Sequence, residues 1–230
     1  MIDPEQIKKN VKDLLSGIPS GITVVAAAKT RTAPEINAAI EAGISAIGEN
    51  YFQEAASVRP LLKGNFEFHY IGRIQSNKAK RIAGLFDKVQ TLSGLGTAEI
   101  IDRYLNEKGE KKEFFIEVNI ASEKNKSGVL PDDLESFASG LSAFPALEIT
   151  GLMTMGPFDA GADEMKRYFQ KAKNLFERLK DKSGTNMNMK YLSMGMSGTY
   201  HLAIECGANM VRIGTGIFGE RREAVKRVES

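Results

Sequence analysis

Residues 22–30 of the chain read Ile-Thr-Val-Val-Ala-Ala-Ala-Lys-Thr, and this stretch decides how the rest of the sequence is interpreted. Its almost unbroken apolar run is typical of a strand that is buried on both faces, as in a parallel sheet. Because side chains alternate along a strand, Lys29 shares one face with Val25 and Ala27, and the residues between them face the other way. If the first face lines the interior of an α/β barrel, Lys29 lies at the carboxyl end of its strand, where such barrels place their chemistry.

Lys29 has two interpretations at this point. A partly desolvated lysine is a usable amine nucleophile and is the residue type that forms Schiff bases. The plain structural alternative is a lysine that ends the strand and extends into water, since buried lysines are rare. The stretch alone leaves both open.

The remaining sequence alternates between strand-like and helix-like segments. Eight strands alternating with helices favour one closed α/β barrel of the (β/α)8 TIM type over an open doubly wound sheet. No linker interrupts the pattern, so we expect residues 1–230 to form a single domain. The expected strands are 22–30, 45–47, 66–71, 88–92, 114–120, 147–153, 191–194 and 210–213. The expected helices are an extra N-terminal one at 4–16, then 33–42, 51–62, about 79–83, 96–107, 130–143, 162–182 and 199–205, and a terminal one from about Phe218.

The composition excludes several classes of function. Lysine and arginine number 31 against 29 acidic residues, a net charge of +2, so nothing demands a nucleic acid or an anionic membrane as partner. The single cysteine, Cys206, permits no internal disulfide and no cysteine metal cluster, which indicates a reducing cytoplasm. No apolar run is long enough for a transmembrane helix. The two histidines, His69 and His201, lack the spacing of a metal-binding motif, so we expect no metal site.

Two glycine-rich loops follow the last two expected strands. The first reads Ser193-Met194-Gly195-Met196-Ser197-Gly198-Thr199, and the second reads Gly214-Thr215-Gly216-Ile217-Phe218-Gly219. In (β/α)8 barrels these two positions often hold phosphate, because glycine lets the backbone approach an anion and hydroxyl and N–H groups then bind it. The alternative is that Ser197 and Thr199 only cap a helix and the second loop only makes a turn.

Arg212 lies between Val211 and Ile213 in the last expected strand. If its two neighbours face the helices, its side chain points into the barrel. A guanidinium group stays protonated and needs an acceptor when it is buried. An amine that can form an imine, a phosphate cradle and an inward arginine together suggest pyridoxal 5′-phosphate as the cofactor.

At this point the chain resembles the pyridoxal-phosphate homeostasis protein family, also called the proline synthetase co-transcribed homologue family, which is related to the N-terminal barrel of alanine racemase. Seven ordered blocks between about Val24 and Arg221 carry the resemblance. They are Ala28-Lys29-Thr30, Gly48-Glu49-Asn50-Tyr51-Phe52-Gln53-Glu54, His69-Tyr70-Ile71-Gly72-Arg73-Ile74-Gln75-Ser76-Asn77-Lys78, Lys126-Ser127-Gly128, Gly151-Leu152-Met153, Ser193-Met194-Gly195-Met196-Ser197 and Val211-Arg212-Ile213-Gly214-Thr215-Gly216-Ile217-Phe218-Gly219.

The resemblance implies roles for particular residues. Lys29 would form the Schiff base, and Arg212 would face the nitrogen of the pyridine ring. The phosphate group would be held by Ser197, Gly214 and Thr215, and the same resemblance places Asn50, Met194 and Gly198 among the residues that bind the cofactor.

Two positions depart from the usual family pattern. Residue 31 is often lysine there and is Arg31 here, which removes a second transferable amine. Two places after Ser197 the family commonly has aspartate, and this chain has Thr199; both residue types cap helices, so phosphate binding should survive.

The leading functional hypothesis is a carrier that holds pyridoxal 5′-phosphate on Lys29 and buffers or delivers it within the cell, with apo forms of pyridoxal-phosphate enzymes as possible recipients. The alternative is an amino-acid racemase of the same fold type. A racemase of the alanine racemase type needs a second acid/base, which resembles a tyrosine from a separate C-terminal domain of the partner subunit. We expect this chain to lack that domain, and the spacing singles out none of Tyr51, Tyr70 and Tyr200, so no catalytic residue is assigned.

Two further expectations complete this interpretation. The absence of a domain that would contact a partner subunit favours a monomer. A Schiff-base aldolase acting on a sugar phosphate is a third, weaker hypothesis, because such barrels usually carry their lysine on a later strand.

Overall fold

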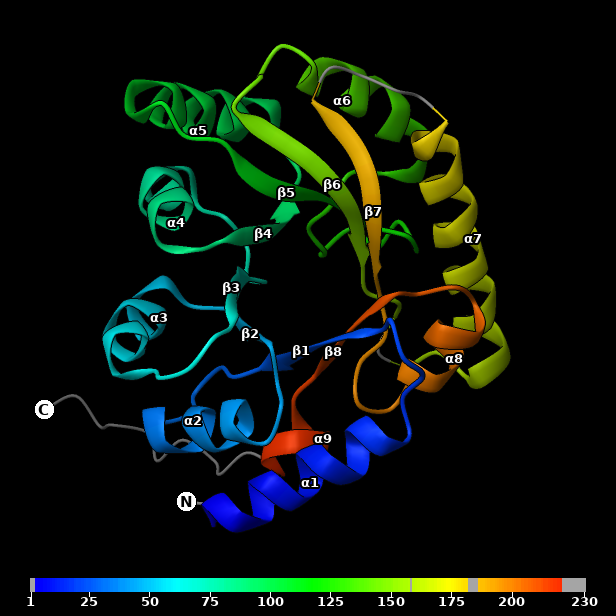
Figure 1. Cartoon of the computed structure of the whole chain (residues 1–230). Helices are drawn as coiled ribbons and strands as arrows, with labels where there is room; N and C mark the ends of the chain where they lie inside the picture. Colours follow the sequence, from blue (N-terminus) through cyan, green and yellow to red (C-terminus); the bar gives the residue numbers. More distant parts are fainter. Residues whose placement is uncertain (1–2, 158, 182–185, 221–230) are drawn as a thin grey trace, which may run out of the picture.

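The computed structural model describes residues 3–157, 159–181 and 186–220. In this part of the chain, eight parallel strands close into a barrel in sequence order and helices surround it (Figure 1). The strands are β1 (Thr23–Ala27), β2 (Ala46–Glu49), β3 (Glu67–Tyr70), β4 (Lys88–Leu92), β5 (Lys112–Val118), β6 (Leu147–Thr154), β7 (Met187–Ser193) and β8 (Met210–Ile213). The predicted (β/α)8 barrel is confirmed.

The α-helices are α1 (Pro4–Ser16), α2 (Ala33–Glu41), α3 (Phe52–Val58), α4 (Ala79–Leu85), α5 (Leu95–Lys108), α6 (Leu134–Leu141), α7 (Ala162–Lys180), α8 (Tyr200–Glu205) and α9 (Thr215–Phe218). Short 3₁₀ helices occupy η1 (Arg59–Leu61), η2 (Ser76–Lys78) and η3 (Pro131–Asp133). The extra N-terminal helix has the predicted bounds, with Asp3 as its N-cap accepting from the backbone of Glu5.

Several predicted boundaries were wrong; β2 spans Ala46–Glu49 rather than 45–47, and β5 spans Lys112–Val118 rather than 114–120. β1 ends at Ala27 rather than Thr30, because Thr30 adopts a left-handed conformation (φ 66°) that turns the chain away from the sheet. β7 begins at Met187 rather than 191, since Met187 already pairs with Ile149 of β6 although polar residues follow it. The short α9 was not predicted, and the terminal helix predicted from about Phe218 falls mostly on residues 221–230, which lie outside the described chain.

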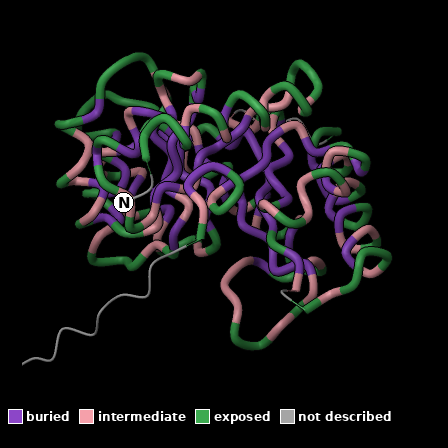
Figure 2. The backbone as a smooth tube through the Cα atoms, turned by 90° about the horizontal axis from the view of Figure 1, so that it is seen from below, coloured by how far each residue is buried: buried purple, intermediate pink, exposed green. Residues whose placement is uncertain are grey.

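An apolar layer between the strands and the helices forms the main core. Val24, Ala26 and Ala28 of the opening stretch belong to it, as the alternation predicted. The aromatic rings of Phe68 and Phe86 stack within this layer with their centroids 4.7 Å apart. Figure 2 shows the buried residues gathered along the strands and on the inner sides of the helices.

The barrel interior contains a second, much smaller apolar cluster. Its fully buried members are Val25, Ala46, Phe115, Met153 and Met210. The membership of Val25 confirms that the face shared by Val25 and Ala27 points into the barrel. Buried polar side chains share this interior with the cluster, among them His69, Gln90 and Arg212.

Among the strand pairs of the described barrel, β7 and β8 have the fewest paired residues. The two strands are paired in register only at Ser193 and Met210. The side chain of Asn209 extends the junction, because its Oδ1 accepts from the backbone N–H of Leu192 (2.7 Å) and its Nδ2 donates to the carbonyl oxygen of Lys190 (2.7 Å). Three backbone hydrogen bonds also cross this junction, from Met194 N to Met210 O (3.1 Å), from Arg212 N to Gly195 O (3.0 Å) and from Asn209 N to Leu192 O (3.3 Å), so the Asn209 amide adds to a short backbone pairing.

Within the described ranges, no helix combines the length and the apolar character needed to cross a bilayer.

Candidate functional site

Lys29 lies in a turn that follows β1, at the carboxyl end of the barrel strands, and it is half-buried. The next residue, Thr30, holds its left-handed conformation while its backbone N–H donates to Glu54 Oε2 over 2.9 Å. The backbone N–H of Arg31 closes the turn on the carbonyl oxygen of Ala28 (2.9 Å). The lysine is therefore carried by a constrained turn, as a positioned amine requires.

Arg31 joins this turn to the end of α9. Its guanidinium donates to the carbonyl oxygen of Gly219 (2.9 Å) and lies over the ring of Phe218, 5.6 Å from the ring centroid. It also forms an ion pair with Glu35 at 3.7 Å. The arginine that replaces a second amine at this position is thus a structural link between the Lys29 turn and the loop after β8.

The two glycine-rich loops meet at Ser197. The backbone N–H groups of Gly214 and Gly216 both donate to Ser197 Oγ, over 3.3 and 3.2 Å. Gly214 also lies against β1, since a Cβ atom on it would be 3.6 Å from the carbonyl oxygen of Ala27. The expected phosphate loops are therefore adjacent to each other and to the strand that leads to Lys29.

Arg212 points into the barrel, as predicted, and its side chain is almost completely buried. Nη1 donates to Ser193 Oγ (2.6 Å) and Nη2 donates to the carbonyl oxygen of Thr154 (2.9 Å). Burial lowers the pKa of the guanidinium to about 10, while the nearby charge of Glu117 acts in the opposite direction. The group stays protonated at neutral pH and acts only as a donor.

Asn50 follows β2 at the same end of the barrel. It is half-buried, and its Nδ2 donates to the carbonyl oxygen of Ile71 over 3.4 Å. A Cβ atom on Gly72 would lie 2.0 Å from the carbonyl oxygen of Asn50, so only glycine permits this close approach of the β2 and β3 loops. The Gly72 of the sequence motif therefore holds the loop of Asn50 in place.

Comparison with known proteins identifies the family. Residues 2–222 match the family described as alanine racemase, N-terminal domain. A pyridoxal phosphate homeostasis protein of Haemophilus influenzae is 37% identical over 206 residues, which cover 87% of this chain and 85% of that protein. The protein of the same name from Escherichia coli K12 is 34% identical over 207 residues, covering 88% and 87%. The chain belongs to the pyridoxal phosphate homeostasis protein family.

Solved structures agree with this family assignment. PipY of Synechococcus elongatus PCC7942 has been solved without pyridoxal phosphate (TM-score 0.87, 31% identity, covering 93% of this chain and 100% of that one). The same protein with pyridoxal phosphate bound gives a TM-score of 0.85 at 30% identity, covering 93% and 100%. The alanine racemase of Corynebacterium glutamicum shares the fold (TM-score 0.77), at 18% identity and with this chain covering 62% of its length.

Of the remaining predicted site residues, Met194 and Gly198 lie in the β7 loop, and Thr215 begins α9 after β8 and is exposed. The side chain of Met194 is fully buried in the main core, so any contact it makes at the barrel mouth comes from its backbone. Gly198 is exposed, and a Cβ atom on it would meet nothing within 4 Å. Gly195 adopts φ 90°, and a Cβ atom there would lie 2.6 Å from that of Ala203. In this loop Gly195 is required by geometry and Gly198 is not.

The expectation that Thr199 caps a helix was wrong in its mechanism. Thr199 occupies the N-cap position of α8, but its side chain makes no hydrogen bond to the helix. Its Oγ1 instead accepts from the backbone N–H of Met196 over 3.1 Å. The hydroxyl therefore closes the loop that carries Ser197, which still serves the predicted phosphate loop.

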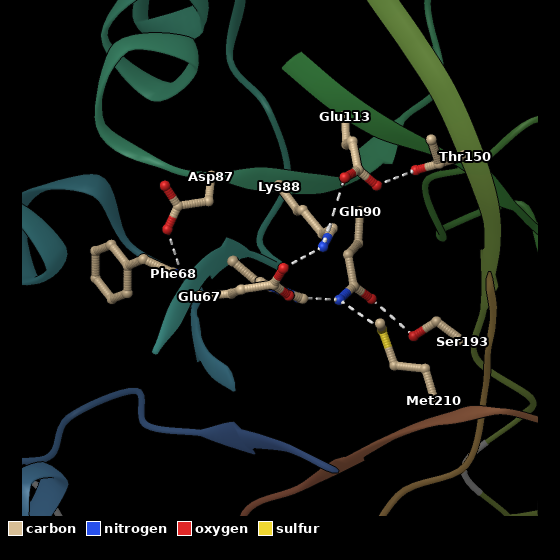
Figure 3. A network of polar contacts seen from close by, with 10 residues as sticks. Glu67, Phe68, Asp87, Lys88, Gln90, Glu113, Thr150, Ser193 and Met210 are labelled. Atoms are coloured by element: carbon tan, nitrogen blue, oxygen red, sulfur yellow. Dashed lines mark hydrogen bonds and ion pairs between the residues drawn. The ribbon is translucent and has the colours of Figure 1, made fainter. Parts of the chain in front are cut away.

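A chain of polar side chains inside the barrel is the main feature that the sequence did not predict. From Arg212 it continues through Ser193 Oγ, which donates to Gln90 Oε1 (2.7 Å), and Gln90 Nε2 lies 2.8 Å from His69 Nδ1. His69 Nε2 lies 3.1 Å from Glu67 Oε2. Figure 3 shows Gln90 between Ser193 and the Glu67 side of the network. The one sequence feature that could have indicated these residues is that each polar residue, such as His69 or Gln90, stands between apolar or β-branched neighbours in its strand.

The lower end of this chain is an ionic cluster near the amino ends of β3, β4 and β5. Lys88 Nζ contacts Glu67 Oε1 (2.5 Å) and lies 3.6 Å from Glu113 Oε1. Thr150 Oγ1 donates to the other oxygen of Glu113 over 2.8 Å (Figure 3). The hydrogen bond from His69, followed by the interaction with Lys88, lowers the pKa of Glu67 to about 2 despite partial burial.

Two buried carboxyl groups at the mouth also escaped prediction. Glu49 is 1% exposed; burial and then the charge of Glu54 raise its pKa to about 8. Glu117 accepts from Ser127 Oγ over 2.9 Å, and burial raises its pKa too. Glu117, Ser127, Arg73 and Lys126 are among the residues that line a cavity of about 230 Å³ beyond β5. Glu49 belongs to the sequence block 48–54 that resembles the family, and Glu117 contacts Ser127 of the block 126–128.

Proposed function

We propose that this chain binds pyridoxal 5′-phosphate reversibly through a Schiff base on Lys29 and serves pyridoxal phosphate homeostasis by buffering and delivering the cofactor. The observation that carries the proposal is the pyridoxal phosphate bound to PipY. That relative is 30% identical to this chain, in a comparison that covers 93% of this chain. The names of the curated relatives support the same function.

The groups at the barrel mouth fit the chemistry of this cofactor. An aldehyde needs an amine, which Lys29 supplies from its constrained turn. A phosphate needs several donors in one place, and the N–H groups of Gly214 and Gly216 already converge on one oxygen, that of Ser197. A pyridine nitrogen that is not protonated accepts a hydrogen bond, and Arg212 can only donate.

Roles follow for the remaining predicted residues. Thr215 would add its hydroxyl to the phosphate site beside Gly214, and Gly198 would contribute a backbone N–H from the facing loop. Asn50 would contact the ring from the β2 side, and Met194 would line the site through its backbone. When bound, the cofactor supplies the reactive aldehyde; the protein binds, orients and shields it.

The proposal takes residues 1–230 as one domain that acts as a monomer in the cytoplasm. The barrel closes on itself, so the sheet has no edge strand in the described chain that would need a partner. The proposed recipients are apo forms of pyridoxal-phosphate enzymes, to which the carrier would pass the cofactor.

The test is an absorbance spectrum of the purified protein with pyridoxal 5′-phosphate, followed by borohydride reduction and peptide mass mapping. We expect a visible imine band, with the label on Lys29 in the wild type and no band in Lys29→Ala. Lys63→Ala, which changes an exposed lysine, is the matched control and should behave as the wild type. Labels scattered over surface lysines would contradict the proposal.

A second measurement separates the carrier from a racemase. Transfer of the cofactor from the loaded protein to an apo-enzyme supports the carrier. Exchange of the Cα proton of an L-amino acid, faster than with free cofactor and abolished by changing one tyrosine, would instead support a racemase. Tyr70 is the most constrained candidate for such a role, because its hydroxyl donates to the carbonyl oxygen of Arg73 over 3.1 Å, whereas Tyr51 is 54% exposed.

A further inference from the structure

The polar chain inside the barrel has donors and acceptors that can be assigned one after another. At its upper end, the guanidinium of Arg212 can only donate, so Ser193 Oγ accepts there and must use its single hydrogen toward Gln90. The oxygen of the Gln90 amide therefore faces Ser193, and its NH₂ group faces His69.

The lower end fixes the same direction independently. An ionised carboxylate only accepts, so His69 Nε2 carries the hydrogen of the neutral ring and donates it to Glu67 Oε2. His69 Nδ1 then carries no hydrogen and accepts from Gln90 Nε2. A donor-only group at one end and an acceptor-only group at the other leave one arrangement for every hydrogen bond between them.

We propose that Gln90 and His69 are positioning residues for Arg212: by accepting the hydroxyl hydrogen of Ser193, Gln90 holds the Ser193 oxygen in the orientation that receives the Arg212 guanidinium and keeps it toward the cofactor ring, and His69 holds Gln90. Gln90 is fully buried, as is His69, and neither belongs to the mouth of the barrel. The inference rests on the proposed function, because the group that Arg212 would meet is the pyridine nitrogen of pyridoxal 5′-phosphate.

Because Ser193, Gln90 and His69 are buried, this series of hydrogen bonds is sensitive to the exchange of one donor for an acceptor. A buried donor or acceptor that loses its partner costs more than the hydrogen bond itself contributed. Replacing the Gln90 amide by an acceptor-only group leaves Nδ1 of His69 facing an acceptor and forces a hydrogen onto it. Replacing it by an apolar group leaves the Ser193 hydroxyl free to rotate, so that of the two hydrogen-bond acceptors of Arg212 in the described chain the carbonyl oxygen of Thr154 alone keeps a fixed orientation.

The first arm of the test uses the ligand-free protein. Nitrogen-15 NMR of the histidine rings, with His201→Gln to identify the signal of His69, should show the neutral Nε2–H tautomer in the wild type. Gln90→Glu should place a hydrogen on Nδ1. An Nδ1–H tautomer in the wild type, or an unchanged tautomer in Gln90→Glu, would overturn the assigned direction of the chain.

The second arm measures the affinity for pyridoxal 5′-phosphate from the imine band. We expect Gln90→Leu and His69→Leu to bind about tenfold more weakly, the order expected when one charge-assisted hydrogen bond is misdirected. His69→Asn keeps an acceptor near the position of Nδ1 and should restore most of that loss. Met210→Leu is the matched control: Met210 Sδ is a weak acceptor for the second hydrogen of Gln90 Nε2 (3.3 Å) and does not connect Gln90 to Arg212, so this variant should bind as the wild type.

A third arm distinguishes positioning from general damage. Inorganic phosphate tests the two glycine-rich loops alone, and we expect its affinity to be the same in Gln90→Leu as in the wild type. An equal loss for phosphate and cofactor, or equal effects of Gln90→Leu and Met210→Leu, would overturn the positioning role. Absence of an imine band in the wild type itself would reject the proposed function instead, and the NMR arm would still decide the direction of the chain.

Discussion

The layer outside the barrel strands and the interior of the barrel differ in the polarity of their buried side chains. Between the strands and the helices lies one continuous apolar core, whereas the barrel interior holds a small apolar cluster crossed by hydrogen-bonded polar side chains. Phe68 and His69 are neighbours in β3 and both fully buried, yet the first stacks on an aromatic ring and the second joins the polar chain.

This difference separates two tasks. Apolar burial is non-directional and stabilises the fold roughly in proportion to area. Hydrogen bonds contribute little net stability but are directional, so they specify geometry. We expect substitutions in the outer layer to change stability, and substitutions in the interior to change ligand binding more than stability.

The largest effect should come from Phe68→Ala in the outer layer. Removing a fully buried ring should lower the free energy of unfolding by about 3–5 kcal/mol, measured by urea denaturation. The affinity of the folded fraction for pyridoxal 5′-phosphate should stay unchanged, in contrast to His69→Leu one residue later. Equal losses of affinity in the two variants would erase the distinction between the layers.

Glu49 is an ionisable residue in the otherwise apolar outer layer, because alternation along β2 places it on the same face as Ile47. It therefore tests what burial in that layer does to a carboxyl group. Its pKa of about 8 in the folded protein, against 4.5 ordinarily, means that the folded state keeps a proton that the unfolded state loses. Stability should therefore fall as pH rises from 4.5 to 8. Glu49→Gln should remove this fall and be more stable than the wild type at pH 8.5, by something on the order of 2–4 kcal/mol.

The control for Glu49 is the same pair of proteins at pH 4.5, where the two should be nearly equal in stability. Denaturant midpoints across the pH range measure both quantities. A wild-type stability that does not change between pH 5 and 8 would contradict the assignment of a proton to the buried carboxyl group.

Glu67 tests the ionic end of the interior. Its pKa is lowered to about 2, so its stabilising contribution is present above pH 4.5 and is lost as pH falls toward 2. The Glu67 side chain is 49% exposed, so solvent screening reduces the contribution of its charge, and Glu67→Gln should cost about 1 kcal/mol at pH 7, since it weakens contacts with His69 and Lys88 while Glu113 remains. The variant should also show a flatter acid limb than the wild type in chemical denaturation, and an unchanged limb would count against the cluster.

The smallest effect should come from a charge pair on the surface. Arg103 and Glu99 form an exposed i,i+4 pair on α5 at 3.2 Å. Arg103→Ala should change stability by less than about 0.5 kcal/mol and leave ligand binding unchanged. A thermal melt suffices, and a loss comparable to that of Glu67→Gln would mean that charge alone, rather than burial, sets the scale.

The outer layer was predictable from the sequence because its signal is periodic. Apolar residues at strand and helix spacing gave the eight strands, the face of Val25 and the inward direction of Arg212. The failures at boundaries are also physical. The left-handed Thr30 that ends β1 carries no distinctive sequence signal, and the polar residues at the start of β7 conceal a strand that the neighbouring β6 recruits.

The interior was not predictable in the same way. Glu67, Lys88 and Glu113 have the composition of a solvated surface, and only closure of the barrel brings them together. The direction of the Gln90 amide depends on partners about 20 residues away in His69 and about 100 residues away in Ser193. Pairings over such separations have no periodic signature in a single sequence.

The limited pairing between β7 and β8 has a consequence for local opening of the barrel. The β5–β6 pair has seven register pairs, whereas this junction has one register pair, three backbone hydrogen bonds and the two hydrogen bonds of the Asn209 side chain. Local opening follows the least-supported contacts, so amide hydrogen exchange should be faster at Leu192 and Met194 than in the long β5–β6 pair. Since Ser193 and Arg212 flank this junction, such openings would let solvent isotope reach the interior from the side of the barrel and bypass its mouth.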